Sequence, residues 1–209
     1  QIVEAIRAHQ KIGAGAARAL AVSLLRKVGI ADSERRFGAF PHELSGGMRQ
    51  RVMIATAIAN GPRVIVADEP TTALDVTIQA QVLDLLRTLQ RESRLAMLFI
   101  THSLPVVAEI AHRVAVMYAG EIVEEGPVGE VFAHPRHPYT AALLEAAPNE
   151  DGPPPRPIPG TVPRPDAVPR GCAFAPRCAR VVAACGQAHP ALAAIGPGRR
   201  SRCIRAAEL

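Results

Sequence analysis

The sequence predicts an α/β protein built on parallel β-strands. Residues 64–67 form an apolar, largely β-branched run and residues 95–101 a second apolar run, both typical of strands. Residues 77–92 between them have the period of an amphipathic helix. A helical crossover of this length is the usual connection between two parallel strands. With 209 residues, 48% of them hydrophobic, the chain can form one sizeable core plus an appendage.

The N-terminal residues 1–30 are rich in Ala, Leu, Val, Arg and Glu, which predicts a helical region. Its apolar residues recur at helical spacing: Leu20, Leu24, Leu25 and Val28. Residues 37–43 then form an approach that Pro41 stiffens, followed by a helix over residues 48–60 that ends at Gly61 and Pro62.

A turn of Ser45, Gly46 and Gly47 opens that second helix. The first N–H groups of a helix have no partner inside it, and they carry the positive end of the helix dipole, so this end can face a phosphate. Neither glycine has a Cβ to keep an anion from the main chain. Alone the pair would indicate only a helix-start turn.

The first predicted strand ends on two carboxylates, Asp68 and Glu69, followed by Pro70. Open α/β sheets place their ligand groups at the carboxyl ends of strands. There one carboxylate can hold a hard cation and the other can activate water. His102 follows the second strand and falls at the same edge. The alternative interpretation is a solvated strand-end pair and a structural histidine.

Further along the chain, Pro105 fits the first turn of a helix that reaches about residue 112. Residues 114–118 and 121–125, joined at Ala119 and Gly120, predict a hairpin that closes the sheet edge. Ten of the nineteen prolines then fall between residues 148 and 176, which predicts an extended arm before a compact cysteine-bearing segment.

The charge is uneven along the chain. Residues 1–150 carry 15 Lys and Arg against 16 Asp and Glu, whereas residues 151–209 carry 9 against 3. The basic tail fits either phosphate or lipid headgroups, or a solvated arginine-rich surface. Only 3% of the residues are aromatic and none is Trp, so the chain has few side chains on which the bases of single-stranded nucleic acid could stack. We therefore expect no nucleic-acid partner. No apolar run reaches the roughly 18 residues that span a bilayer, so membrane association is expected to come through a partner.

All four cysteines fall in the tail, at Cys172, Cys178, Cys185 and Cys203. Chain size and composition argue against a disulfide scaffold. The spacings, of five, six and seventeen intervening residues, match no two-residue zinc knuckle. A [4Fe-4S] cluster, a tetrahedral zinc ion and unliganded thiols all remain open.

Residues 1–147 resemble the ATP-binding subunit of ABC transporters. The resemblance rests on LSGGMRQR at residues 44–51, the strand before Asp68-Glu69-Pro70, Ala73-Leu74-Asp75, and Thr101-His102. The continuation is similar to the dipeptide and oligopeptide import branch, which includes nickel and glutathione importers. That second resemblance rests on His137-Pro138-Tyr139-Thr140, Leu143-Leu144, the proline-rich arm and the cysteine segment beginning Gly171-Cys172.

The resemblance implies a P-loop NTPase-like nucleotide-binding domain in three parts. These are a helical subdomain with the signature at 1–60, an ATPase core with acidic strand end, histidine loop and C-terminal hairpin at 61–147, and the arm with its cysteine segment at 148–209. It also implies ATP and Mg²⁺ as cofactors, and it favours an iron-sulfur cluster at the four cysteines.

In such proteins two subunits clamp two ATP molecules head to tail. The resemblance implies that Glu69 activates water and His102 reaches the γ-phosphate. It implies that Asp68 serves the Mg²⁺ ion of its own nucleotide and that Asp75 couples the two sites. It also implies that the ATP held by the partner subunit is contacted at its γ-phosphate by Ser45, Gly46 and Gly47, with Gln50 continuing the signature helix.

The sequence departs from the family pattern because it contains no Gly-x-x-x-x-Gly-Lys loop, adenine-stacking aromatic or Mg²⁺-sensing Gln. We therefore expect that these 209 residues are the C-terminal part of a longer subunit. Alone, this part is expected to bind ATP weakly. The implied partners are a second ATPase subunit, identical or paralogous, two membrane permease subunits and, indirectly, an extracytoplasmic solute-binding protein. The implied location is peripheral, on the cytoplasmic face of the inner membrane. The alternatives are a non-transport ABC ATPase and a degenerate, non-enzymatic, metal-bearing interaction module.

Overall fold

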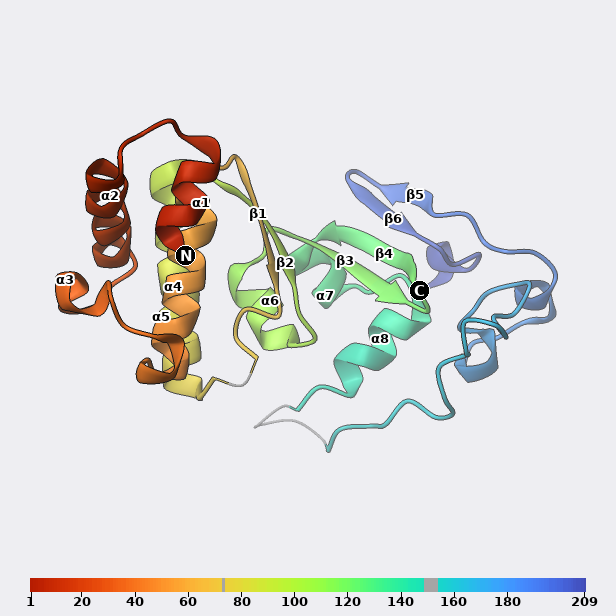
Figure 1. Cartoon of the computed structure of the whole chain (residues 1–209). Coiled ribbons are helices and arrows are strands. Elements are labelled where there is room, and N and C mark those ends of the chain that lie inside the picture. Colours follow the sequence, from red (N-terminus) through yellow and green to blue (C-terminus); the bar gives the residue numbers. More distant parts are fainter. Residues whose placement is uncertain (73, 149–153) are drawn as a thin grey trace. The chain divides into compact units, whose positions relative to one another are not determined.

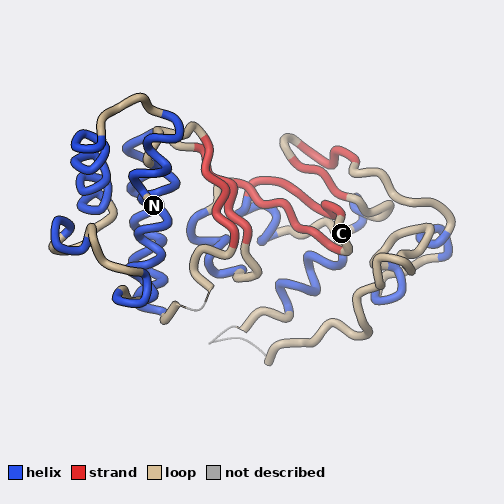
Figure 2. Tube along the Cα trace, in the orientation of Figure 1, coloured by secondary structure: helices blue, strands red, loops and turns tan. Residues whose placement is uncertain are grey.

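A computed structural model of the chain describes residues 1–72, 74–148 and 154–209. They form two compact units, residues 1–102 and 103–209 (Figures 1 and 2). The predicted division into three parts, with boundaries at residues 60 and 147, is of a different kind from these two compact units and stays a prediction. Ala73, of the Ala73-Leu74-Asp75 motif, and residues 149–153, of the predicted proline-rich arm, lie outside the described residues.

Helices dominate the first half of unit 1 (Figure 1). They are α1 (Ile2–His9), α2 (Ala14–Lys27), α3 (Ser33–Arg36) and α4 (Gly46–Ile58), with a 3-10 turn, η1 (Pro41–Glu43), before α4. Their core contains side chains with no exposed surface, including Ile6, Ala17, Ala21, Val28 and Ala55. The helical prediction for residues 1–30 is confirmed.

The strand–helix–strand prediction is also confirmed in unit 1, by β1 (Val64–Asp68), α5 (Val76–Ser93) and β2 (Ala96–Ile100). The two strands are parallel, in a register that pairs Val64 with Ala96 and Asp68 with Ile100. On α5 the buried apolar residues are Val82, Leu83, Leu86 and Leu89.

A continuous β-branched run is typical of a strand buried on both faces, but β1 is buried on one face only. Its exposure alternates: Ile65 and Ala67 pack into a core with Leu95, whereas Val64 and Val66 are 57% and 62% exposed. A strand places successive side chains on opposite faces, and within the described residues only one face of the β1–β2 pair is covered.

Unit 2 opens with α6 (Leu104–Ile110) and the hairpin of β3 (Arg113–Tyr118) and β4 (Glu121–Pro127), followed by α7 (Val128–Ala133) and α8 (Pro138–Glu145). The predicted two-residue turn is confirmed, with φ of 49° at Ala119 and 83° at Gly120. Positive φ at both central residues gives the twist that a tight hairpin needs, which explains a glycine at the second position.

The sequence predicts that the hairpin closes the edge of the first sheet, but its strands are not hydrogen-bonded to β1 or β2. It joins a four-stranded antiparallel sheet in the order β3-β4-β6-β5, with β5 (Ala193–Gly196) and β6 (Arg199–Ser201) from the cysteine segment. The rest of that segment contains only 3-10 turns, η2 (Ala175–Arg177), η3 (Ala183–Gly186) and η4 (Ala206–Glu208). The unit 2 core includes Tyr118 beside Phe174, whose rings meet edge to face at 5.2 Å. The cysteine segment thus folds onto the hairpin.

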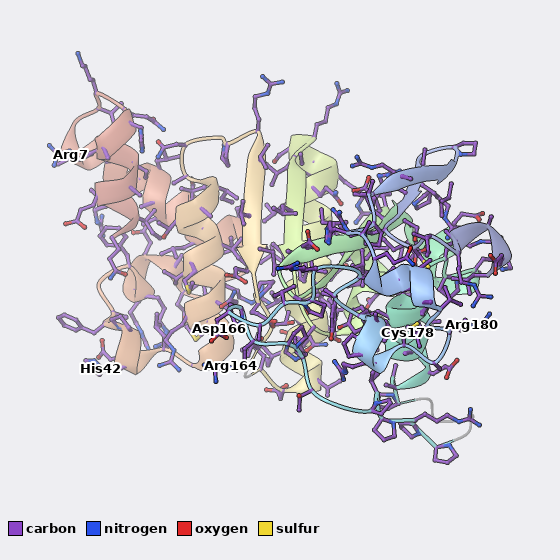
Figure 3. All side chains as sticks on the ribbon, turned by 90° about the vertical axis from the view of Figure 1, so that its right-hand side faces the viewer. Arg7, His42, Arg164, Asp166, Cys178 and Arg180 are labelled. Carbon is purple, nitrogen blue, oxygen red and sulfur yellow. The ribbon has the colours of Figure 1, made fainter. Side chains whose placement is uncertain are left out.

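The described part of the arm, residues 154–170, has no helix or strand, as its prolines predict. Arg177 ties the arm to the unit 2 core, since its guanidinium donates to the carbonyls of Ile158 (3.1 Å) and Pro159 (2.8 Å) and to the Tyr118 hydroxyl (3.3 Å). Arg164 and Asp166 form an exposed ion pair on the arm (Figure 3). No helix among the described residues is long and apolar enough to cross a membrane.

Candidate functional site

The signature, residues 44–51, places Ser45 at the N-terminus of α4. Ser45 has extended backbone angles and its hydroxyl accepts a hydrogen bond from the Met48 N–H at 3.3 Å. This cap fixes the first turn of the helix. Ser45 and Gly46 are exposed and Gln50 is half-buried, so the amide end of α4 is accessible in this unit.

Gly47 allows α4 to pack against α5. A Cβ placed on Gly47 would lie 2.5 Å from Cγ2 of Ile78, whereas one on Gly46 would meet Leu74 at an ordinary 3.7 Å. Ile78 lies in the first turn of α5, which Asp75 caps by accepting the Ile78 N–H at 2.9 Å. The two helix N-termini therefore lie side by side, and the predicted coupling residue Asp75 caps the second one.

The acidic strand end brings Glu69 and His102 together. Asp68 is the last residue of β1 and pairs with Ile100 of β2, and the Glu69 N–H donates to the Ile100 carbonyl at 2.9 Å. His102 follows two residues later, and its Nδ1 lies 2.8 Å from Glu69 Oε1. Asp68 is exposed beside this pair. The sequence predicted that these side chains share one edge of the strand pair, and the register produces that result.

A second donor holds the other oxygen of Glu69. The Thr72 hydroxyl donates to Glu69 Oε2 at 2.5 Å. Together, this hydrogen bond and the one from His102 hold the pKa of Glu69 below its ordinary value, because both stabilise the carboxylate. Glu69 is thus ionised at neutral pH, as a residue that accepts a proton from water must be.

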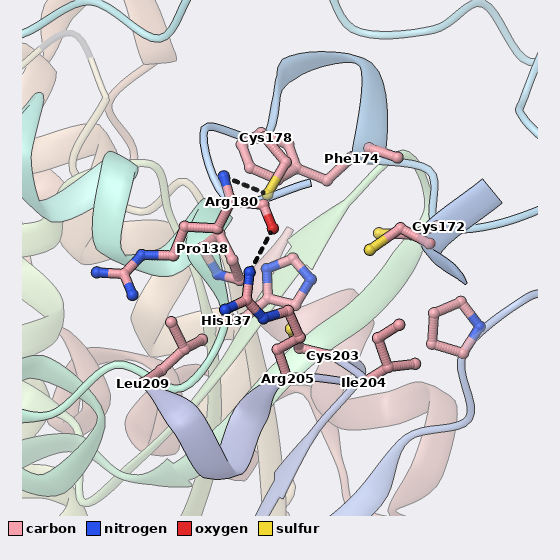
Figure 4. Close-up of a pocket in the computed structure, with 13 residues that line it drawn as sticks. His137, Pro138, Cys172, Phe174, Cys178, Arg180, Cys203, Ile204, Arg205 and Leu209 are labelled. Carbon is pink, nitrogen blue, oxygen red and sulfur yellow. Dashed lines mark hydrogen bonds between the residues drawn. The ribbon is translucent and has the colours of Figure 1, made fainter. Parts of the chain in front are cut away.

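The four cysteines converge on one pocket of unit 2 (Figure 4). None forms a disulfide; Cys185 is buried and the other three are half-buried. The pocket is lined by the four cysteines together with His137, Phe174, Arg180 and Arg205. Among the residues that the structure describes, no three Cys, His, Asp or Glu side chains converge as ligands of one ion.

Burial raises the pKa of the Cys172, Cys178 and Cys203 thiols, because it disfavours the charged thiolate. Main-chain N–H groups oppose this effect, for example Arg180 N–H, which donates to Cys178 Sγ at 3.4 Å. Without a ligand these thiols stay protonated at neutral pH, so they are not reactive nucleophiles.

His137 is 1% exposed and caps the N-terminus of α8. Its Nδ1 accepts the Tyr139 N–H at 3.1 Å, and burial lowers its pKa to about 4, so the ring is neutral at pH 7. Beneath it the fully buried Glu124 carboxylate accepts from the N–H groups of Arg136 (2.8 Å) and His137 (3.0 Å) and from Arg199 (3.0 Å). This network joins α8 to β4 and β6.

Two family models match the chain. Residues 3–72 match the ABC transporter model and residues 123–185 match the C-terminal region of oligopeptide/dipeptide transporters. The first part of the chain is thus similar to an ABC transporter region and the later part to the C-terminal region of oligopeptide/dipeptide transporters. The two ABC elements described above, the signature helix and the acidic strand end, both lie within the first match.

Curated relatives span the same residues. The chain is 55% identical over its full length to the peptide import ATP-binding protein BMEII0863 of Brucella melitensis, and 49% identical over 97% of its length to BAB2_1052 of Brucella abortus. It covers 64% and 61% of those two proteins. The ATP-binding cassette MJ0796, solved as a dimer with ADP and Pi, is 31% identical and superposes with a TM-score of 0.50 over 57% of this chain and 50% of its own. The ABC ATPase fold is therefore confirmed.

Sequence reasoning missed three residues that position the ABC elements: Thr72, Ile78 and Arg51. Arg51 donates to the carbonyl of Val28, at the end of α2, at 2.6 Å and to Gln81 of α5 at 3.2 Å, so it links three helices. Arg51 lies within the signature and Thr72 three residues after Glu69, and those positions are the only signal the sequence offers. The Ile78 contact depends on how two helices pack and has no local signal.

Proposed function

We propose that this chain belongs to the ATP-hydrolysing subunit of an ABC importer of peptides. The observation that carries the proposal is Glu69 paired with His102 at the ends of two parallel strands, in the same unit as the accessible amide end of the signature helix. An ionised carboxylate and an imidazole at this position can orient water and face a γ-phosphate. Catalysis of this kind works by positioning and charge stabilisation.

In this proposal each half of the site acts on a different nucleotide. Asp68 serves the Mg²⁺ of its own ATP, while Glu69 activates the attacking water and His102 contacts the γ-phosphate. Asp75 couples the two sites. The γ-phosphate of the partner subunit's ATP is bound by the signature residues Ser45, Gly46, Gly47 and Gln50. The exposed amide end of α4 at Ser45 and Gly46, with no Cβ on Gly46, supports that assignment.

We further propose that the phosphate-binding loop is supplied outside these 209 residues. No Gly-x-x-x-x-Gly-Lys sequence occurs in them, so ATP binding by this stretch alone would be weak and turnover absent. The match to the oligopeptide/dipeptide transporter region supports import over a non-transport ABC ATPase. The proximity of Glu69 to His102 argues against a degenerate interaction module.

The proposed partners are a second ATPase subunit, two membrane permease subunits and, through them, a solute-binding protein. MJ0796 was solved as a dimer, and the relatives are named as peptide import proteins. Such a subunit would attach peripherally to the cytoplasmic face of the membrane. ATP binding would close the two ATPase subunits and hydrolysis would release them.

Uptake measurements test this function. With the complete ATPase, its permeases and binding protein in proteoliposomes, we expect labelled dipeptide or oligopeptide to accumulate only when Mg²⁺ and ATP are present on the ATPase side. Vesicles given ADP are the control. Uptake of nickel or glutathione in place of peptide would show that the substrate is not a peptide. ATP hydrolysis without uptake of peptide, nickel or glutathione would contradict the import function.

We propose that the four cysteines hold a [4Fe-4S] cluster. The proposal is supported by four thiols that line one pocket and by the main-chain N–H that donates to Cys178 Sγ, since hydrogen bonds to the sulfurs are common in iron-sulfur sites. A bound cluster would cross-link the loops that carry Cys172, Cys178 and Cys185 to Cys203 beyond β6.

Anaerobic purification tests the cluster. We expect a brown protein with visible sulfur-to-iron charge-transfer absorption and equal amounts of iron and acid-labile sulfide. Cys203→Ser is expected to lose most of the colour, because it removes one of four ligands, while Ser23→Ala on α2 leaves it intact. A colourless, iron-free wild type would refute the proposal, and one atom of zinc per chain would replace the cluster with a zinc site.

A further inference from the structure

Both oxygens of the Glu69 carboxylate are held, each by a different donor. His102 Nδ1 lies 2.8 Å from Oε1, and the Thr72 hydroxyl lies 2.5 Å from Oε2. The Glu69 side chain is 37% exposed, so packing alone does not fix its rotation. One donor leaves a carboxylate free to rotate about that contact, whereas two donors on opposite oxygens define its plane.

The main chain around Glu69 brings Thr72 into reach. Glu69 has a φ of 47°, in the left-handed region that a non-glycine residue rarely adopts. Its N–H is held by the Ile100 carbonyl at 2.9 Å, and its own carbonyl accepts the Thr72 N–H at 3.2 Å. The chain therefore turns sharply after β1 and places a hydroxyl three residues later against the Glu69 carboxylate.

We propose that Thr72 is a positioning residue for Glu69 in the ATPase reaction. The inference rests on the proposed function, since it presumes that Glu69 orients the attacking water. Thr72 has no contact with the nucleotide in this proposal and acts only through Glu69. It holds one carboxylate oxygen so that the other lone pairs face the water rather than solvent.

Three variants of the complete, permease-coupled ATPase test the inference. Thr72→Val removes the hydroxyl but keeps the branched shape, and we expect kcat to fall about tenfold while KM for ATP stays within about twofold. Thr72→Ser keeps the hydroxyl and is expected to restore most of kcat. Thr88→Val on α5 is the matched control and should behave as wild type. A Thr72→Val enzyme with wild-type kcat, or a Thr72→Ser enzyme as slow as Thr72→Val, would overturn the inference.

A double-mutant cycle separates this role from a general loss of structure. If Thr72 acts through Glu69, Thr72→Val adds no further loss of residual turnover to Glu69→Gln. An equal loss in both backgrounds would show a structural effect and would also overturn the inference. The proposed function fails separately, if Glu69→Gln itself leaves turnover unchanged. Loss of turnover in Glu69→Gln with full turnover in Thr72→Val would remove Thr72 alone.

Discussion

Glu69→Gln in the complete ATPase is expected to lower kcat for ATP hydrolysis at least about 100-fold, the scale of a lost general base. Glutamine keeps the size of Glu69 and one oxygen, so His102, 2.8 Å away, still has an acceptor. It cannot take a proton from water. ATP binding uses other groups, so the ATP-bound closed dimer should accumulate. Steady-state turnover and size-exclusion chromatography with Mg²⁺ and ATP measure both effects.

The matched control for that substitution is Glu92→Gln. Glu92 is also a glutamate in unit 1, with a 58% exposed side chain and a 3.8 Å ion pair to Lys27 at the surface. Exposed pairs of this kind contribute little, so turnover and dimer formation should match the wild type. Wild-type turnover in Glu69→Gln would contradict the base assignment, and equal loss in both variants would indicate a non-specific charge effect.

The parts of the fold that sequence predicted well are those with a strong local pattern. β1, α5 and β2 follow from a change of apolar period along the chain, and the turn at Ala119 and Gly120 follows from the backbone angles it needs. Because parallel strands end at one edge of a sheet, the side chains that follow them could be expected to lie together. The distance between Glu69 and His102 depends on the register of β1 and β2, which the sequence does not display.

The parts that sequence missed depend on contacts distant in the chain. The strands β5 and β6 read Ala-Ala-Ile-Gly and Arg-Arg-Ser, with little β-branched content. Strand β6 pairs with Glu124 and Glu125 of β4 through Ser201 and Arg200, and β5 pairs in turn with β6. The exposure of Val64 and Val66 is likewise a property of what covers the sheet. Neither feature leaves a local signal.

Thr72 illustrates the same limit within the site. A threonine that follows Asp-Glu-Pro suggests a turn, and a turn alone would account for the presence of a threonine at this position. Only the left-handed φ of Glu69 brings the Thr72 hydroxyl back onto the carboxylate. Sequence therefore identified the two carboxylates and the histidine, Asp68, Glu69 and His102, but not the hydroxyl-bearing neighbour that holds one of them.

Gly171→Ala is expected to destabilise the chain by about 3 kcal/mol or more, the scale of a buried steric clash. A Cβ on Gly171 would lie 2.2 Å from the main-chain carbonyl oxygen of Cys185 and 2.8 Å from Cα of Gly186. Main chain cannot rotate away as a side chain can, so the two loops would have to separate. That separation would also break the 2.8 Å hydrogen bond from Cys172 N–H to the Cys185 carbonyl. Urea unfolding of the cluster-free chain measures the loss.

Gly186→Ala is the matched control, because a Cβ there meets nothing within 4 Å. We expect its unfolding free energy to stay within about 0.5 kcal/mol of the wild type. If Gly171→Ala were as stable as Gly186→Ala, the close approach of the two cysteine loops would be wrong. Since Cys172 and Cys185 belong to those two loops, the proposed cluster adds a second readout: the iron bound per chain should fall in Gly171→Ala and stay unchanged in Gly186→Ala. The glycine before Cys172 would then be required by the approach of two backbones, which is a geometric condition for four thiols to share one pocket.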